Sequence, residues 1–243
     1  MFIVWLATVH PTLPPPVRET TPAYPRWFWE MPSDKVAAFA VGYARRYARI
    51  ETSFAYVRRQ SVWQLVRSQQ VKVDCSQELL NQFGQNRLLR LKESEQIDSS
   101  LAPTIVASMS IIDSAVVGDM VLALAAFPSH SNLNIRNERT SPSRRPQWLE
   151  VLPTEQSAIY VVGTSPLYYY EHHSWERAEA HARRQLASAL TTHIRSTGEK
   201  TGQRMQVWSE SQSSVTLRHA IVIKRWFDVS SRQCYVLCRM PIQ

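Results

Sequence analysis

Aromatic and imidazole side chains that can bind other molecules gather in one short segment, Tyr168-Tyr169-Tyr170 followed by His172 and His173. Tyrosine is enriched at protein interfaces, and loops often carry the residues that recognise a partner. This segment is therefore a candidate interaction site. The alternative is that one or two of the tyrosines pack over the start of the helix that follows. The sequence leaves both interpretations open.

A second candidate interaction site is basic. Guanidinium groups form bidentate pairs with carboxylates and phosphates, so an anionic lipid head group, a cell-wall polymer or an acidic protein would suit it. The alternative is a helix face that is simply solvated. The net charge is +8, but no run of five or more like charges occurs, which argues against a nucleic-acid partner. The arginines of this group are Arg45, Arg46, Arg49, Arg58 and Arg59.

The histidines near the tyrosines do not have the spacing of a metal site. His181 and His193 are twelve residues apart, which is about 120° around a helix of 3.6 residues per turn. The chain contains neither H-E-x-x-H nor Cys-x-x-Cys, the spacings typical of zinc sites. We predict no metal site and no cofactor.

Catalytic patterns are equally sparse. Neither G-x-S-x-G nor a phosphate-binding glycine motif occurs, although nucleophile elbows and nucleotide sites use them. Asp113 and Asp228 both follow apolar residues, and a carboxylate pair across the two halves of the chain is conceivable. Aspartates that form turns are the ordinary interpretation. We predict that the protein is not an enzyme, and an unrecognised hydrolase is the third alternative.

The three cysteines, Cys75, Cys234 and Cys238, are too few for a scaffold held by disulfides. On one strand Cys234 and Cys238 would be about 13 Å apart, whereas a disulfide requires Cα atoms within about 7 Å. We expect both to be small buried apolar side chains. A disulfide from Cys75 to either one stays open.

The strongest sign of organisation is that the chain repeats itself. The segment from Pro25 to Ala44 returns as Pro146 to Ser165 without a gap. Internal repeats determine how many structural units a chain contains, so we predict two units. The markers that recur at a single offset of 121 residues are Trp27 and Trp148, and Gly42 and Gly163.

These markers have structural interpretations beside functional ones. Trp27 and Trp148 are either platforms for a glycan or a partner protein, or aromatic side chains that dock a segment onto the fold, and we favour docking. Gly42 and Gly163 are expected at a strand exit or bulge where a side chain would clash.

Further along, the offset between the two units changes. AYVRRQ, from Ala55 to Gln60, matches AHARRQ, from Ala180 to Gln185, at an offset of 125. Four extra residues are therefore expected in the second unit, within Leu167 to Glu171. Near the ends of the units, MVLALAAFP matches QCYVLCRMP at an offset of 113.

Hydrophobic periodicity predicts the elements of the first unit. A short apolar strand covers Lys35 to Ala44, and a helix runs from Ile50 to about Val71. The segment from Cys75 to Asn86 is expected to be a second short helix or a loop. Met120 to Phe127 has the pattern of a strand.

The second unit has a clearer helix. Ser174 is a plausible N-cap, and the apolar residues that follow mark one face. Glu179 and Arg183, at positions i and i+4, are expected to support the exposed side. Gly198 and Gly202 are expected to end the helix.

Predicted strands precede and follow this helix in the sequence. Ala158 to Gly163 is the first strand, Val215 to Ile223 alternates as a half-buried strand, and Cys234 to Met240 returns after a turn. The order is β-α-β-β, as in the first unit. We therefore predict an α+β protein of two tandem β-α-β-β domains, each a long helix packed on a small, mainly antiparallel sheet.

Prolines and polar residues mark the domain boundaries. We assign residues 1–24 to a Pro-rich leader, 25–128 to the first domain, 129–145 to a polar, basic linker and 146–243 to the second domain. The first residues, MFIVWLATVH, are similar to the core of a signal peptide, although they are short and lack a basic leader. We interpret them as the remnant of an export signal; the alternative is a hydrophobic tail without a structure of its own.

Taken together, these elements resemble those of a known family. A Pro-x-Trp opening, a strand ending in Val-Gly, a long Ala/Arg helix and LRHAIVIKRWFD closing on YVLCRMP are similar to the LPP-twenty lipoproteins. These are bacterial outer-membrane lipoproteins of twenty kilodaltons, related to the N-terminal region of a flagellar H-ring assembly protein. The similarity covers Pro146 to Pro241 and Pro25 to Ala44, with a looser version at Ser108 to Pro128. The lipid-bearing Cys of the family is missing from the first apolar run.

The resemblance implies a β-α-β-β domain, an envelope location and an interaction role, and it carries over no catalytic residue. We therefore expect a non-enzymatic cell-envelope protein, periplasmic or associated with the outer membrane, with a structural or assembly role. Its partner would be an envelope protein or a second copy of itself. The alternative is a module that binds an anionic envelope polymer or lipid head group through the Arg-rich faces. Nucleic acid is not expected.

Overall fold

In the computed structural model, one long helix covers a three-stranded antiparallel sheet in the first half of the chain. The strands are β2 (Ala38–Arg45), β5 (Ser110–Val117) and β6 (Met120–Phe127), in the order β2-β6-β5. Helix α2 (Ile50–Gln69) packs on β2 and β6. The structure describes residues 22–34, 36–82, 85–129, 135, 138–198 and 209–242.

The second half repeats this arrangement. Strand β8 (Ala158–Pro166) leads to helix α4 (Glu171–Gly198), which packs on β8 and β11. Strands β10 (Ile221–Asp228) and β11 (Gln233–Pro241) form an antiparallel hairpin, and the sheet order is β10-β11-β8. The predicted fold class, α+β with long helices packed on small antiparallel sheets, is confirmed.

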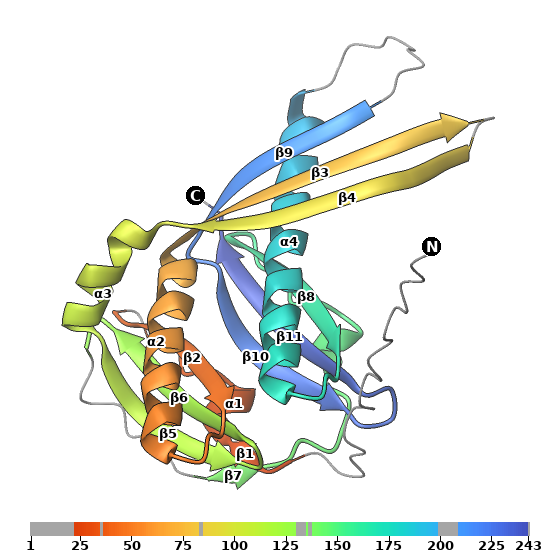
Figure 1. Cartoon of the computed structure of the whole chain (residues 1–243). Helices are drawn as coiled ribbons and strands as arrows, with labels where there is room; N and C mark the ends of the chain where they lie inside the picture. Colours follow the sequence, from red (N-terminus) through yellow and green to blue (C-terminus); the bar gives the residue numbers. More distant parts are fainter. Residues whose placement is uncertain are drawn as a thin grey trace, which may run out of the picture.

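A third sheet joins the two halves. Its strands are β3 (Gln70–Gln82), β4 (Gln85–Ile97) and β9 (Ser209–Arg218). β9 belongs to the second half and pairs with β3 of the first half, from Gln70 opposite Arg218 to Leu79 opposite Ser209. Figure 1 shows this sheet extending away from the rest of the molecule. Short helix α3 (Ala102–Ser108) then leads from β4 to β5.

Two sequence predictions about this region are wrong. The described residues of the segment from Cys75 to Asn86 belong to strands β3 and β4 and not to a helix or a loop, and a distant strand, β9, completes their sheet. Val215 to Ile223 is not one strand. The backbone turns at His219, which has a positive φ of 55°, so Val215 lies in β9 and Ile223 in β10.

Side chains of both halves share the largest hydrophobic core. The alternation of strand β2 explains this, because successive side chains point to opposite faces. Ala40 packs with α2, whereas Val41 and Tyr43 point to the other face. There they join the buried Trp175 and Ala178 of α4. The two units are therefore packed against each other rather than merely connected.

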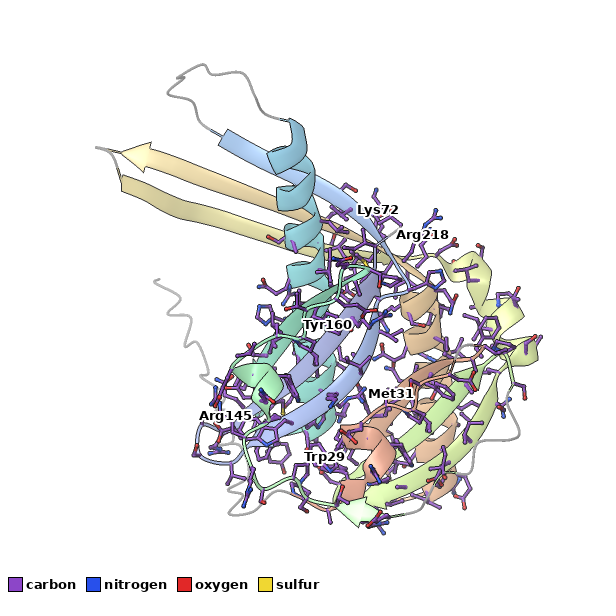
Figure 2. The ribbon with its side chains drawn as sticks, turned by 180° about the vertical axis from the view of Figure 1, so that it is seen from behind. Trp29, Met31, Lys72, Arg145, Tyr160 and Arg218 are labelled. Carbon is purple, nitrogen blue, oxygen red and sulfur yellow. The ribbon has the colours of Figure 1, made fainter. Side chains whose placement is uncertain are left out.

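The N-terminal segment of the first half docks onto the second half. It contains β1 (Tyr24–Pro25) and helix α1 (Arg26–Trp29), and β1 pairs with β7 (Arg139–Thr140). Strand β7 lies within the stretch assigned to the linker, so this stretch is more than a connector. The Tyr24 hydroxyl donates to Glu171 Oε1 of α4 at 2.5 Å. In Figure 2, which shows the molecule from behind, Trp29 lies near β10.

Two glycines set the distance between each helix and its sheet. A Cβ atom on Gly42 would lie 2.5 Å from the Val57 carbonyl oxygen, and one on Gly163 would lie 2.5 Å from the Ala182 nitrogen. The clash is as expected, but it occurs in mid-strand against a helix and not at an exit or bulge.

The starts of the two long helices have the same sequence offset as the two glycines. From Gly42 to Gly163, and from Ile50 to Glu171 at the helix starts, residue numbers differ by 121 in both cases. The predicted four-residue insertion at Leu167 to Glu171 is therefore wrong. A shift of four residues is close to one helical turn of 3.6 residues, so it keeps the same helix face and gives a misleading sequence match.

Equivalent serines hold the loop before each helix. The Tyr47 amide donates to Ser53 Oγ at 2.8 Å, and the Tyr168 amide donates to Ser174 Oγ at 2.7 Å. Ser174 is thus not the N-cap that we predicted, because α4 begins at Glu171. Its hydroxyl instead reaches back to the tyrosine segment. None of the described helices is long and apolar enough to cross a membrane.

Candidate binding cleft

A cleft of about 880 Å³ lies between the two long helices. Figure 1 shows α2 and α4 on the same side of the two sheets, with β4 crossing beside them. A volume of this size lies within the range of ordinary ligand sites. The side chains that line it are Gln60, Gln64 and Arg67 of α2, Glu95 of β4, Leu167 to Tyr170, and His173, Glu176, Arg177, Ala180 and Arg183 of α4.

The predicted tyrosine segment forms one rim of this cleft. Tyr168 and Tyr169 are 40% and 47% exposed, so their rings are available for contact. Tyr170 is half-buried, and its hydroxyl accepts a hydrogen bond from Arg45 Nη1 at 3.0 Å. The Arg45 guanidinium also lies 4.7 Å from the centre of the Tyr170 ring. One residue of the basic group therefore joins the tyrosine segment.

The two predicted histidines follow the tyrosines, and only His173 lines the cleft. His173 Nδ1 lies 3.2 Å from Glu176 Oε2. The two imidazole rings are 4.0 Å apart. Burial, with help from His173 and Arg45, lowers the pKa of His172 to about 4. Burial also raises the pKa of Glu176.

The remaining arginines of the basic group lie elsewhere. They are exposed and do not line the cleft. Tyr47 and Tyr56, which neighbour these arginines in the sequence, stack with ring centres 5.2 Å apart and are 40% and 44% exposed. This aromatic pair was not expected from sequence, because its members are nine residues apart in different elements. The arginines on this side are Arg46, Arg49, Arg58 and Arg59.

A buried cluster of charges forms the inner end of the cleft. Arg183 Nε donates to Glu95 Oε1 at 2.8 Å, and Arg67 Nε lies 3.5 Å from Glu95 Oε2. The exposed fractions of the three side chains are 8% for Arg183, 23% for Arg67 and 17% for Glu95. Burial lowers the pKa of Arg67, and the charge of Arg183 lowers it further. For Arg183 burial alone would lower the pKa, but Glu95 outweighs it and the pKa is raised.

The charged cluster of Arg67, Glu95 and Arg183 was not predicted from the sequence. Arg183 was predicted on the exposed side of its helix, yet it is only 6% exposed. The prediction failed because α4 is covered twice, by its own sheet and by residues of the first half. Nothing in the sequence around Glu95 indicated that it would pair with arginines. It reaches Arg67 and Arg183 only because β4 folds over the helices.

Glu179 was also predicted to be exposed, and it is buried at 3%. Its Oε1 accepts hydrogen bonds from Arg225 Nη2 at 2.8 Å and from the Tyr43 hydroxyl. Arg225 Nη1 donates to the Phe28 carbonyl oxygen at 3.1 Å. Burial and the adjacent Glu179 raise the pKa of Tyr43 well above its ordinary value. This network joins β2, α4, β10 and α1 below the cleft.

The repeat-marker tryptophans are structural. Trp27 is 2% exposed, and its Nε1 donates to Asp113 Oδ2 at 2.8 Å. Trp148 packs with buried residues on the face of the second sheet away from α4, the face on which Figure 2 shows Tyr160. Both agree with the docking interpretation. Asp228 accepts from the Ser230 amide in the β10–β11 turn. Asp113 and Asp228 thus have separate structural partners.

Other candidate chemistry is structural or lies outside the described residues. Cys234 and Cys238 are both buried, and burial raises the pKa of Cys238 to about 12. His181 Nδ1 accepts from the Thr164 amide at 3.0 Å. The side chains of Cys75 and His193 are not described. Within the described part of the chain, no three His, Cys, Asp or Glu residues are placed to hold a metal ion.

Comparison of the chain with models of known protein families, with curated proteins and with solved structures finds no match. Its function therefore has to be inferred from the cleft and the surfaces beside it.

Proposed function

We propose that this protein is a non-enzymatic component of the bacterial cell envelope that holds a segment of a partner protein in the cleft between α2 and α4. The observation that carries the proposal is the position of Tyr168 and Tyr169, which remain exposed on the rim of a cleft of about 880 Å³. Tyrosine side chains give a large contact area and lose little conformational entropy on binding. The resemblance to LPP-twenty lipoproteins supports the envelope location and an assembly role.

The framework around the cleft supports this proposal. β3 of the first half pairs with β9 of the second, and Tyr43 bonds to Glu179 across the same boundary. The helices that form the cleft walls are therefore held in position before a partner arrives. Binding by a preformed site avoids the entropic cost of ordering it.

Site-specific photo-crosslinking in cells tests the proposal. A benzoylphenylalanine residue at Tyr169 should give an adduct in the envelope fraction, because this side chain points to the proposed partner. The matched control is the same residue at Tyr56, which is 44% exposed but does not line the cleft. Equal adducts at both positions, no adduct at Tyr169, or a purely cytosolic protein would each count against the proposal.

The surface around Tyr47 and Tyr56 favours a second candidate function, the binding of an anionic envelope polymer or lipid head group. Four exposed arginines, Arg46, Arg49, Arg58 and Arg59, neighbour the stacked tyrosines in the sequence. Sedimentation with phosphatidylglycerol vesicles tests this candidate. Binding should fall as salt rises, because exposed charges are screened. Binding should be lost in the double variant Arg58→Glu with Arg59→Glu. Binding that changes neither with salt nor with these substitutions would exclude this function.

A further inference from the structure

The buried guanidinium of Arg183 and the half-buried one of Arg67 share the Glu95 carboxylate in the cleft. Glu95 accepts a hydrogen bond from Arg183, but its distance of 3.5 Å from Arg67 Nε is long for a hydrogen bond. Arg67 Nε is buried and has no hydrogen-bond acceptor among the described residues. A buried donor without an acceptor is unfavourable, and such a group calls for an explanation, for example an ordered water or ion or a functional role.

The charge of the cleft lining has the matching sign. Three arginines and two glutamates line it, which leaves an excess of one positive charge among these five residues. Charges that are shielded from water interact more strongly than charges on an open surface. A group with one negative charge would therefore neutralise the lining. The charged residues are Arg67, Arg177, Arg183, Glu95 and Glu176.

We propose that Arg67 binds a carboxylate of the partner segment, either its C-terminus or an Asp or Glu side chain, while Tyr168 and Tyr169 contact the residues next to it. This inference rests on the proposed function and specifies the partner as an acidic peptide segment. A carboxylate in the cleft can pair with the Arg67 guanidinium, which lines it, while Glu95 keeps its hydrogen bond to Arg183.

The acidic residues of the cleft favour a carboxylate over a phosphate group. Glu95 and Glu176 both line the cleft, and like charges held close together repel each other. A phosphate monoester carries between 1.5 and 2 negative charges at pH 7, roughly. The one excess positive charge of the lining can neutralise the single charge of a carboxylate but not the higher charge of a phosphate monoester.

Titration of the full chain with short peptides, followed by NMR at the arginine Nε–Hε groups, tests the inference. The probes are acetyl-tetraalanine with a free C-terminus, the same peptide as its amide, and an amidated acetyl-tetrapeptide with one Glu. Concentrations reach about 10 mM, above the roughly 1 mM dissociation constant of a weak complex. The Arg67 resonance should shift with one or both carboxylate peptides and not with the neutral amide.

Matched variants separate the site from the rest of the protein. Arg67→Gln should weaken binding by about tenfold or more, because it removes hydrogen bonds to a charged group. Arg58→Gln, on the exposed surface outside the cleft, should bind as the wild type does. A titration in which all three peptides shift Arg67 equally, or none does, overturns the inference. If the Tyr169 crosslink persists in that case, the proposed function stands and only the carboxylate is excluded.

Discussion

The Tyr43 hydroxyl of β2 donates a hydrogen bond to the Glu179 carboxylate of α4, and this bond joins the two halves of the chain. Arg225 of β10 meets the same carboxylate with Nη2 at 2.8 Å. The side chains of Arg225 and Glu179 are 1% and 3% exposed. A buried charge needs a partner, so each member of this network depends on the others.

Glu179→Leu should destabilise the protein by about 3–5 kcal/mol, the usual effect of removing one partner of a buried ion pair. Arg225 would then be a buried charge whose ion-pair partner is lost. Urea unfolding followed by circular dichroism measures the change. The double variant Glu179→Leu with Arg225→Met should be less destabilised than the single one, because no unpaired charge remains. Equal instability of the two would show that packing, not charge pairing, is what Glu179 supplies.

The same residues show what sequence could and could not predict. Local patterns were sufficient for β2, β6 and β11, because each is a short, largely apolar run, and for the turn at Asp228. The exposure of Glu179 was predicted from helix spacing alone. Spacing identifies one buried face, and α4 has a second one because β2 of the other half lies against it.

The pairing of strands that are far apart along the chain could not be predicted from the sequence either. Val73 lies between Glu95 of β4 and Val215 of β9, which are far from it along the chain. No local pattern indicates such partners. The cleft shows the same division, since the tyrosine segment was predicted but Arg67 and Glu95, which form its inner end, come together only through β4.

Gly163→Ala should destabilise the protein by about 1–3 kcal/mol, as is usual for overpacking. The new Cβ would lie 2.5 Å from the Ala182 backbone nitrogen, and backbone atoms cannot move aside as a flexible side chain can. Gly42→Ala should act similarly, because the Val57 carbonyl oxygen is 2.5 Å away. Thermal unfolding measures both. Wild-type stability in both variants would contradict this close contact between helix and strand.

Ser174→Ala and Ser53→Ala form a matched pair at equivalent places in the two halves. Each removes the hydroxyl that accepts from a loop amide, that of Tyr168 or Tyr47. We expect a loss of about 1 kcal/mol in each case, similar to the removal of a helix-capping side chain. Urea unfolding of the two single variants measures it. In addition, only Ser174→Ala should reduce crosslinking at Tyr169, because only this serine holds the tyrosine segment; equal effects would contradict that role.

The stability of the protein should fall as the pH drops from about 6.5 to 4, and His172 should contribute to the fall. Its pKa is about 4 in the folded chain, against an ordinary value of 6.5. Between these values the unfolded chain binds a proton that the folded chain does not, which favours unfolding. The contribution of His172 is complete above pH 6.5 and is lost as the pH approaches 4. Urea midpoints measured across this range should change less in His172→Gln than in the wild type.

Glu176→Gln provides the contrast, because its effect has the opposite sign. Burial raises the pKa of Glu176 in the folded chain above its ordinary value of 4.5. The folded chain therefore takes up this proton first as the pH falls, which favours folding. Without Glu176 the loss of stability toward acid pH should be steeper than in the wild type. Parallel curves for the wild type and both variants would show that neither side chain titrates differently in the folded and unfolded chain.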